Sequence, residues 1–287
     1  MNKPKKYATP IAMRTALEER LNRFARENNQ DISRLRRQVA FDRLLARLFT
    51  GQQSNRLVLK GGYAIELRMN QARTTKDIDI SIDDRKLGVA NDEKNLHQLI
   101  QHVAALNLND YFEYTVGESI LDLENAVYGG YRFPIDCRMA GRRFTHFNID
   151  IAAGDVWLDT HEKIPGHQWL NFAGISTPEF PVISSEQQFA EKLHSYSLPR
   201  QTQNSRTKDL IDLILLIERC ALDPEFLREA IKKTFQKRKT HEVPAVLEKP
   251  PESWRIRFGK LAEECGIRYD LESAINRVQQ FNKTLWI

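Results

Sequence analysis

The sequence has no apolar run long enough to cross a bilayer, which takes about 18 consecutive apolar residues. It also has few cysteines, three among 287 residues, and these are widely scattered. A small, odd number of separated cysteines argues against a disulfide framework or a zinc site and suits a reducing compartment. The basic amino-terminal segment lacks an apolar signal core followed by a cleavage site. Together these absences predict a cytoplasmic protein that does not bind membranes.

Internal repeats and low-complexity tracts are lacking as well, and the charge is unevenly distributed. The net charge is +5, yet residues 1–50 alone hold 12 Lys and Arg against 5 Asp and Glu. Such a surplus attracts polyanions through phosphate contacts and counterion release, which favours a nucleic-acid partner. A solvated amphipathic helix face would show the same surplus, so the charge alone leaves both interpretations open.

The spacing of apolar residues predicts the order of secondary-structure elements. Helices are expected over residues 10–29, 31–50, 63–70, 93–108, 185–196 and 208–219, and strands over 57–59, 77–82, 111–116, 127–136 and 144–151. This order predicts an α+β fold, with a mixed sheet preceded by amino-terminal helices and followed by a helical carboxy-terminal region. The same division predicts two domains, residues 1–180 and residues 181–287.

The most informative pattern is Lys60-Gly61-Gly62, followed after 14 residues by two carboxylates, Asp77 and Asp79. Side chains alternate along a strand, so the two carboxylates share a face and repel each other unless a cation lies between them. A hard ion such as Mg²⁺ prefers such oxygens and keeps positions for phosphate oxygens. The glycines would let backbone N–H groups approach a triphosphate beside the positive end of a helix. A solvated acidic strand edge is the alternative, and the upstream glycines favour the metal–triphosphate site.

Asp150 lies in another alternating strand, over residues 144–151. If that strand pairs beside residues 77–82, Asp150 completes a cluster of three carboxylates. Two-ion phosphoryl transfer needs such a cluster to steady the attacking oxygen and the triphosphate. An ordinary exposed acid on a strand is the alternative, and Asp155 competes for the same role.

Further charged residues flank these patterns. Lys192, beside the apolar stripe of a helix, either extends into solvent or points into a cleft and neutralises phosphate charge. Asp209 and Asp212 share one flank of the next helix, where helix capping and surface charge are the alternative to a catalytic role. Arg73 and Lys76 directly precede the carboxylate pair, and both could contact the triphosphate.

Segments spread over residues 57–215 resemble, in this order, the AbiEii family of nucleotidyltransferase toxins. The matching segments are LKGGYAIEL, RTTKDIDIS, FNIDIAAGD, EQQFAEKLHS and RTKDLIDL. The resemblance implies a fold like the nucleotidyltransferase domain of DNA polymerase β. It also implies transfer of a nucleoside monophosphate from a nucleoside triphosphate, with release of pyrophosphate. Many nucleotidyltransferases have Gly-Ser where this chain has Gly61-Gly62, and Gly-Gly is at home in this family.

The resemblance also implies roles for individual residues. Asp77 and Asp79 would bind Mg²⁺ or Mn²⁺, with Gly61 and Gly62 at the phosphate loop. Lys192 would be a catalytic lysine that contacts the nucleotide. Asp209 would be an essential acidic residue and a candidate for the base.

Members of this family are toxins of bacterial toxin–antitoxin or phage-abortive systems, and some add nucleotides to the 3′ end of tRNA, which blocks aminoacylation. The resemblance therefore implies tRNA or another RNA as acceptor and a cognate antitoxin as partner. Two alternatives remain: a transferase that modifies a protein hydroxyl, and a non-catalytic module of the same fold. The intact Asp77, Asp79 and Lys192 argue against the second, because a decayed enzyme should lose its metal ligands first.

Overall fold

The computed structural model describes residues 5–50, 56–69, 71–83, 92–122, 130–153, 156 and 161–286. The chain divides into two compact units. Unit 1 comprises Met1–Leu67, Thr74–Gly154 and Glu162–Val182, and unit 2 comprises Arg68–Arg73, Asp155–His161 and Ile183–Ile287. No helix in the described part of the chain combines the length and the hydrophobicity that a bilayer crossing needs.

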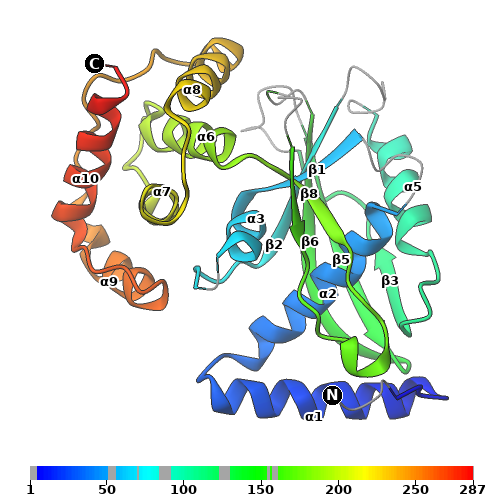
Figure 1. The fold of residues 1–287 in the computed structure, drawn as a ribbon. Helices are drawn as coiled ribbons and strands as arrows, with labels where there is room; N and C mark the ends of the chain where they lie inside the picture. The colour runs from blue at the N-terminus through cyan, green and yellow to red at the C-terminus, as the bar shows by residue number, and fades with distance from the viewer. Residues whose placement is uncertain are drawn as a thin grey trace. The chain divides into compact units, whose positions relative to one another are not determined.

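Unit 1 is built on a mixed sheet with helices packed against it (Figure 1). The described strands are β1 (Leu57–Lys60), β2 (Asp77–Ile82), β3 (Phe112–Val116), β4 (Leu121–Asp122), β5 (Gly130–Met139), β6 (Arg142–Ala153), β7 (His161–Pro165) and β8 (Glu179–Ile183). The helices are α1 (Pro10–Glu27), α2 (Ile32–Leu48), α3 (Gly61–Arg68), α5 (Glu93–Ala104) and the short 3-10 helix η2 (Asn171–Ala173). The strand order is β3-β5-β6-β2-β1-β8-β7, with β4 paired to β5.

Strand β2 lies at the centre of this sheet, parallel to β6 and antiparallel to β1. Its alternating sequence places Ile78 and Ile80 in the core, where both are at most 1% exposed. Ile149 and Ile151 of β6 lie opposite them in register and are buried as well. Because side chains alternate across a strand, the acidic residues of β2 must face the other way. The period-two pattern therefore predicted both the strand and its buried face correctly.

The predicted helix after β1 begins earlier than its sequence indicates. It starts at Gly61, directly after the strand, and not at residue 63. Gly61 has a φ of +66°, a left-handed conformation that glycine adopts without the steric cost of a Cβ atom. The chain therefore passes from strand to helix with no intervening turn residue.

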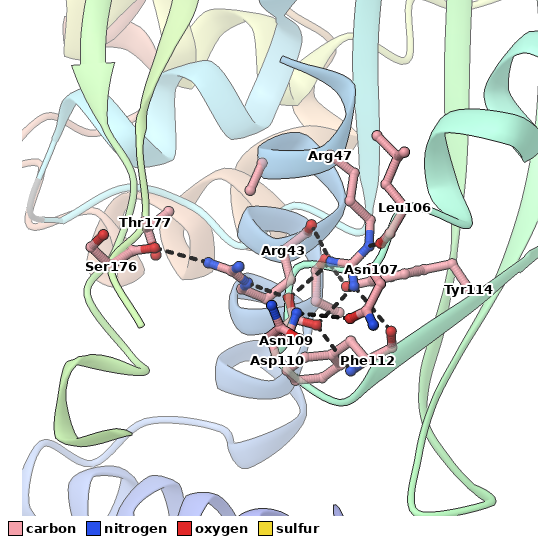
Figure 2. Close-up of polar contacts among 12 residues, drawn as sticks. Arg43, Arg47, Leu106, Asn107, Asn109, Asp110, Phe112, Tyr114, Ser176 and Thr177 are labelled. Carbon is pink, nitrogen blue, oxygen red and sulfur yellow. Dashed lines mark hydrogen bonds and ion pairs between the residues drawn. The ribbon is translucent and has the colours of Figure 1, made fainter. Parts of the chain in front are cut away.

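A buried ionic cluster joins α2 to the segment before β3, as Figure 2 shows. The Asp110 carboxylate accepts hydrogen bonds from Arg43 Nε and Arg47 Nη2, each at 2.7 Å. Arg47 also donates to the carbonyls of Leu106 and Phe112. Burial favours the neutral acid, but the two arginines outweigh it and hold the pKa of Asp110 below its ordinary value. The cluster therefore stays ionised and fixes α2 against the sheet.

Unit 2 is helical, as the sequence predicts. Its described helices are α6 (Ser185–Ser197), α7 (Thr207–Arg219), α8 (Pro224–Arg238), the 3-10 helix η3 (Glu252–Trp254), α9 (Arg255–Glu264) and α10 (Leu271–Thr284). Helix α7 packs against α6, α9 and α10. Its apolar stripe includes Leu210, Leu213 and Ile214, which are fully buried. The helix therefore forms the centre of this unit.

Two histidines in unit 2 belong to one chain of hydrogen-bonded polar side chains. His194 accepts a hydrogen bond at Nδ1 from Arg238, so its proton lies on Nε2, which bonds Thr240 Oγ1 at 2.8 Å. Thr240 Oγ1 lies 2.9 Å from His241 Nδ1, and His241 Nε2 bonds Ser197 Oγ. Burial, with the charges of Arg238 and the neighbouring histidine, lowers the pKa of His194 to about 3. The His194 ring is therefore neutral in the folded protein at pH values well above 3.

This pKa shift predicts acid sensitivity of unit 2. Below the unfolded pKa of 6.5, the unfolded chain takes up a proton that folded His194 refuses until about pH 3. Stability is therefore lost as the pH falls through this window, by about 2 kcal/mol between pH 7 and pH 5. Urea unfolding at the two pH values should show this loss in the wild type and a smaller one in His194→Gln. An equal loss in both proteins would contradict the assignment.

Candidate active site

Four charged residues form one row across one face of the sheet in unit 1. Lys60 on β1 lies opposite Asp79 on β2, and Asp79 lies opposite Asp150 on β6. Asp150 in turn lies opposite Arg132 on β5. Residues in register share a face, and all four are half-buried. The strand pairing on which a cluster of three carboxylates depends is thus present in the structure.

The other acidic residue of β2, Asp77, is held by a neighbouring amide. Asn148, opposite it on β6, donates from Nδ2 to Asp77 Oδ1 at 3.0 Å. A side-chain amide also has a carbonyl acceptor, so this contact orients the carboxylate without neutralising its charge. Among the described residues, no side chain donates a hydrogen bond to the second carboxylate oxygen of Asp77. Asp77 is therefore positioned but keeps its negative charge available.

Arg132 is a residue that the sequence analysis missed. It binds Asp150 through two hydrogen bonds, Nε to Oδ1 at 2.7 Å and Nη2 to Oδ2 at 2.6 Å. The bond to Asp150, together with the charges of Asp150, Asp77 and Asp79, raises the pKa of Arg132 above its ordinary value. The guanidinium therefore lies in the field of all three carboxylates. The hairpin alone would not have revealed the pairing, because the register at its turn, Met139 opposite Arg142, sets Arg132 opposite Ile149, and the irregularity between Cys137 and Arg138 shifts the partner to Asp150.

The backbone of Gly61 approaches the Asp79 carboxylate closely. A Cβ atom added to Gly61 would lie 1.9 Å from Asp79 Oδ2, closer than any non-bonded contact allows. Only glycine therefore fits between the end of β1 and this carboxylate. The backbone at the start of α3 and the carboxylate pair consequently belong to one local structure, as the spacing of the two sequence patterns suggested. Gly62 follows in the first turn of α3 and is buried.

In unit 2, Lys192 on α6 binds two carboxylates of α7. Its Nζ lies 2.9 Å from Asp209 Oδ1 and 2.8 Å from Asp212 Oδ2. Burial would lower the pKa of Lys192, but the two carboxylates outweigh it and raise the pKa above its ordinary value. Lys192 is therefore charged and does not extend into solvent as a surface lysine would.

Asp209 and Asp212 differ in how completely their oxygens are bonded. Asp212 is fully buried and accepts two hydrogen bonds from Arg73 in addition to Lys192. These cations hold the pKa of Asp212 below its ordinary value although burial opposes them. Asp209 Oδ2 is buried without a hydrogen bond from any described residue, and Arg206 Nε lies 3.9 Å away. Asp209 is thus the acid with an acceptor position open.

The predicted site residues fall into two groups. Unit 1 brings together Lys60, Gly61, Gly62, Asp77, Asp79 and Asp150, with Lys76 exposed just before β2. Unit 2 brings together Arg73, Lys192, Asp209 and Asp212. Asp155 lies outside the described residues. That both groups serve one reaction stays a prediction, as does the contact of Arg73 with a triphosphate.

The carboxylate pair of β2 has the chemistry that a divalent ion requires. Asp77 and Asp79 offer carboxylate oxygens from one strand face, which fits a hard ion such as Mg²⁺ or Mn²⁺. Asp150 already uses both oxygens on Arg132. Within the described ranges, no three His, Cys, Asp or Glu side chains are grouped so that they could hold one ion. The pair therefore fits the ion, and the role of Asp150 as a third ligand stays a prediction.

Comparison with known proteins identifies a family over most of the chain. The family model described as "Nucleotidyl transferase AbiEii toxin, Type IV TA system" matches residues 43–274. A search of curated proteins gives no significant match.

Among solved structures, the nucleotidyltransferase toxin MenT4 from Mycobacterium tuberculosis is 18% identical, with a TM-score of 0.57 over 91% of this chain and 99% of that one. JHP933 from Helicobacter pylori is 12% identical, with a TM-score of 0.45 over 85% of this chain and 88% of that one. At such identities the likeness to MenT4 shows the fold alone. The predicted nucleotidyltransferase fold is thus confirmed.

Proposed function

This chain belongs to the AbiEii family of nucleotidyltransferase toxins, and from that premise we propose that it transfers a nucleoside monophosphate to the 3′ end of an RNA, most simply a tRNA. The observation that carries the proposal is the close approach of Gly61 to Asp79 beside Asp77 on the same strand face. This arrangement sets a side-chain-free backbone segment at the start of a helix against two carboxylates. A triphosphate and its divalent ion require these two features.

In the proposed reaction the acceptor hydroxyl oxygen forms a bond to the α-phosphorus of the triphosphate. The bond from that phosphorus to the β-phosphate bridging oxygen breaks, and pyrophosphate leaves with the electron pair. Asp77 and Asp79 would hold Mg²⁺ or Mn²⁺, which supplies positive charge that offsets the triphosphate charge. Asn148 keeps the Asp77 carboxylate oriented, and Arg132 keeps Asp150 in place beside Asp79. The carboxylates thus bind and orient, while the hydroxyl provides the nucleophile.

The roles of Lys192 and Asp209 rest on the family resemblance. We propose that Lys192, whose charged side chain is 15% exposed, contacts the nucleotide phosphates. Asp209 is the proposed acceptor of the hydroxyl proton, supported by the oxygen that has no hydrogen bond among the described residues. Asp212 would then act only as a positioning residue for Lys192 and Arg73. The same resemblance supports a cognate antitoxin as partner and a role in phage defence.

The acceptor class can be tested directly. The purified protein is incubated with each nucleoside triphosphate, labelled at the α-phosphate, together with total RNA or total protein. The proposal predicts label in small RNA at its 3′ end, removed by a 3′ exonuclease. Label in protein only would replace the RNA acceptor by a protein hydroxyl, and label in neither would contradict transfer to both classes.

Replacing Gly61 by alanine is expected to lower nucleotide transfer about 10²-fold, because a Cβ atom would displace the Asp79 carboxylate by a distance that matters for catalysis. Gly141→Ala is the matched control, since Gly141 has a φ of +69° but open space around its Cβ position. Both variants carry the same backbone strain, worth about 1–2 kcal/mol of stability. Steady-state transfer rates and thermal melts of both proteins separate the effects. Equal activity losses would assign the effect to strain alone.

A further inference from the structure

A small pocket on unit 1 combines aromatic and basic side chains that the proposed reaction does not use. It lies between the end of α1 and the segment that leads into η2, and it encloses about 300 Å³. Phe24, Trp169 and Phe172 supply its aromatic surface, and Arg20 and Arg23 supply positive charge. The family match begins at residue 43, so α1 precedes the matched segment.

The packing of α1 leaves aromatic surface available at this pocket. The apolar stripe of α1 is buried at Met13, Leu17 and Leu21, but its continuation at Phe24 is 36% exposed. Phe24 and Trp169 pack in a T-shaped arrangement, with their ring centres 5.2 Å apart and their ring planes at 90°. The half-buried Trp169 has an indole N–H without an acceptor among the described residues. Phe24 thus exposes aromatic surface beside the half-buried Trp169, and exposed apolar surface next to charged side chains is typical of a binding site.

The charge of the pocket favours an anionic ligand. The guanidinium of Arg20 lies 4.0 Å from the ring centre of Phe172. Arg23, three residues later in α1, is exposed. Neither arginine forms an ion pair with a carboxylate in the described part of the chain. Gln168 uses its side-chain amide on the backbone of Gly166 and Thr177, so at the rim Glu27 alone is left to accept a hydrogen bond from the amino group of a base. The surplus of positive charge in residues 1–50 acts in the same direction.

We propose that this pocket binds an unpaired base of the acceptor RNA, with the base against Phe24 and Trp169 and the adjoining phosphates against Arg20 and Arg23. Single-stranded RNA is recognised by stacking of splayed bases on aromatic and guanidinium planes, whereas a duplex hides its base faces. The identification of this RNA as the acceptor rests on the proposed function. The binding of an unpaired base in this pocket does not depend on the proposed function. The amino-terminal helix thereby contributes to the choice of RNA.

Tryptophan fluorescence tests the proposal without catalysis. The full chain is titrated with a single-stranded RNA of about 12 nucleotides, and with its duplex, without triphosphate or divalent ion. The single strand should quench the fluorescence and bind more tightly than the duplex. Phe24→Ala should weaken binding about 5- to 150-fold, the range for loss of one stacked base. Arg23→Gln should weaken it and lower the slope of log affinity against log salt by about one phosphate contact.

Two variants control for nonspecific effects. Ile11 is another surface-exposed apolar residue of α1, at 69% against 36% for Phe24, and Ile11→Ala should bind RNA as the wild type does. Arg268→Gln removes the same charge from an exposed position of unit 2 and should leave the salt slope unchanged. The proposal is overturned if Phe24→Ala binds the single strand like the wild type, if the single strand does not bind, or if an acidic peptide quenches the tryptophan fluorescence and RNA does not. Transfer activity measured in parallel keeps a failure of this pocket distinct from a failure of the proposed reaction.

Discussion

Replacing Asp77 with asparagine is expected to lower nucleotide transfer by about 10³-fold or more. The substitution keeps the shape of the side chain but removes the charge that a divalent ion needs. Loss of one preorganised group that stabilises charge in the transition state costs about 10²–10³-fold on its own. Asn148, which now donates to the carboxylate, can still pair with an amide oxygen, so the strand pairing survives. The loss should therefore appear in the transfer rate at unchanged melting temperature.

The control for this experiment is Asp136→Asn. Asp136 lies on β5 of the same sheet, with its carboxylate bound to the exposed Arg138 and Arg143. The change removes the same charge from the same unit, away from the row of Asp79 and Asp150. Transfer by Asp136→Asn should equal that of the wild type. Comparable losses in both variants would show that net charge, and not the position of Asp77, determines the rate.

Asp110→Ala is expected to cause the largest loss of stability, about 3–5 kcal/mol, since it leaves two buried guanidiniums without their shared carboxylate. Such a loss corresponds to a decrease of about 6–20 °C in the melting temperature of unit 1. Arg43 and Arg47 are both at most 4% exposed as side chains, so water cannot replace the lost partner. Guanidinium unfolding followed by circular dichroism measures the effect.

Asp136 again provides the matched comparison, because it too is an aspartate bound by two arginines. Its partners are 47% and 62% exposed, so the pair is screened by solvent. Asp136→Ala should cost no more than about 1 kcal/mol, the upper end for surface ion pairs. If the two alanine variants were equally stable, burial would not determine the contribution of the Asp110 cluster.

Alternation along strands allowed part of the site to be predicted from sequence. The period of β2 set Asp77 and Asp79 on one face, and the matching period of β6 brought Asp150 beside them once the two strands paired. Local patterns of this kind depend only on residues that are close in the chain. The helical spacing of α7 likewise placed Leu210 and Leu213 in the core of unit 2. The faces of these elements needed no knowledge of distant contacts, whereas the pairing of β2 with β6 did.

Contacts between distant segments could not be predicted in the same way. Arg132 reaches Asp150 through a hairpin register that shifts at the irregularity between Cys137 and Arg138. Asp110 gains its partners from a helix more than 60 residues earlier in the chain. The distinction between Asp209 and Asp212 depends on Arg73, which is 139 residues from Asp212. Each of these pairings is set by topology, which charge patterns in the sequence do not encode.

The most direct test of the account compares triphosphate labelled at the α-phosphate with triphosphate labelled at the γ-phosphate, in wild type and in Asp77→Asn. The carboxylate pair on β2 should support transfer of the nucleoside monophosphate. The prediction is α-label in the acceptor, γ-label in pyrophosphate, dependence on Mg²⁺ or Mn²⁺, and loss of the α-label in Asp77→Asn. γ-Label in the acceptor, or undiminished α-label with Asp77→Asn, would contradict the account.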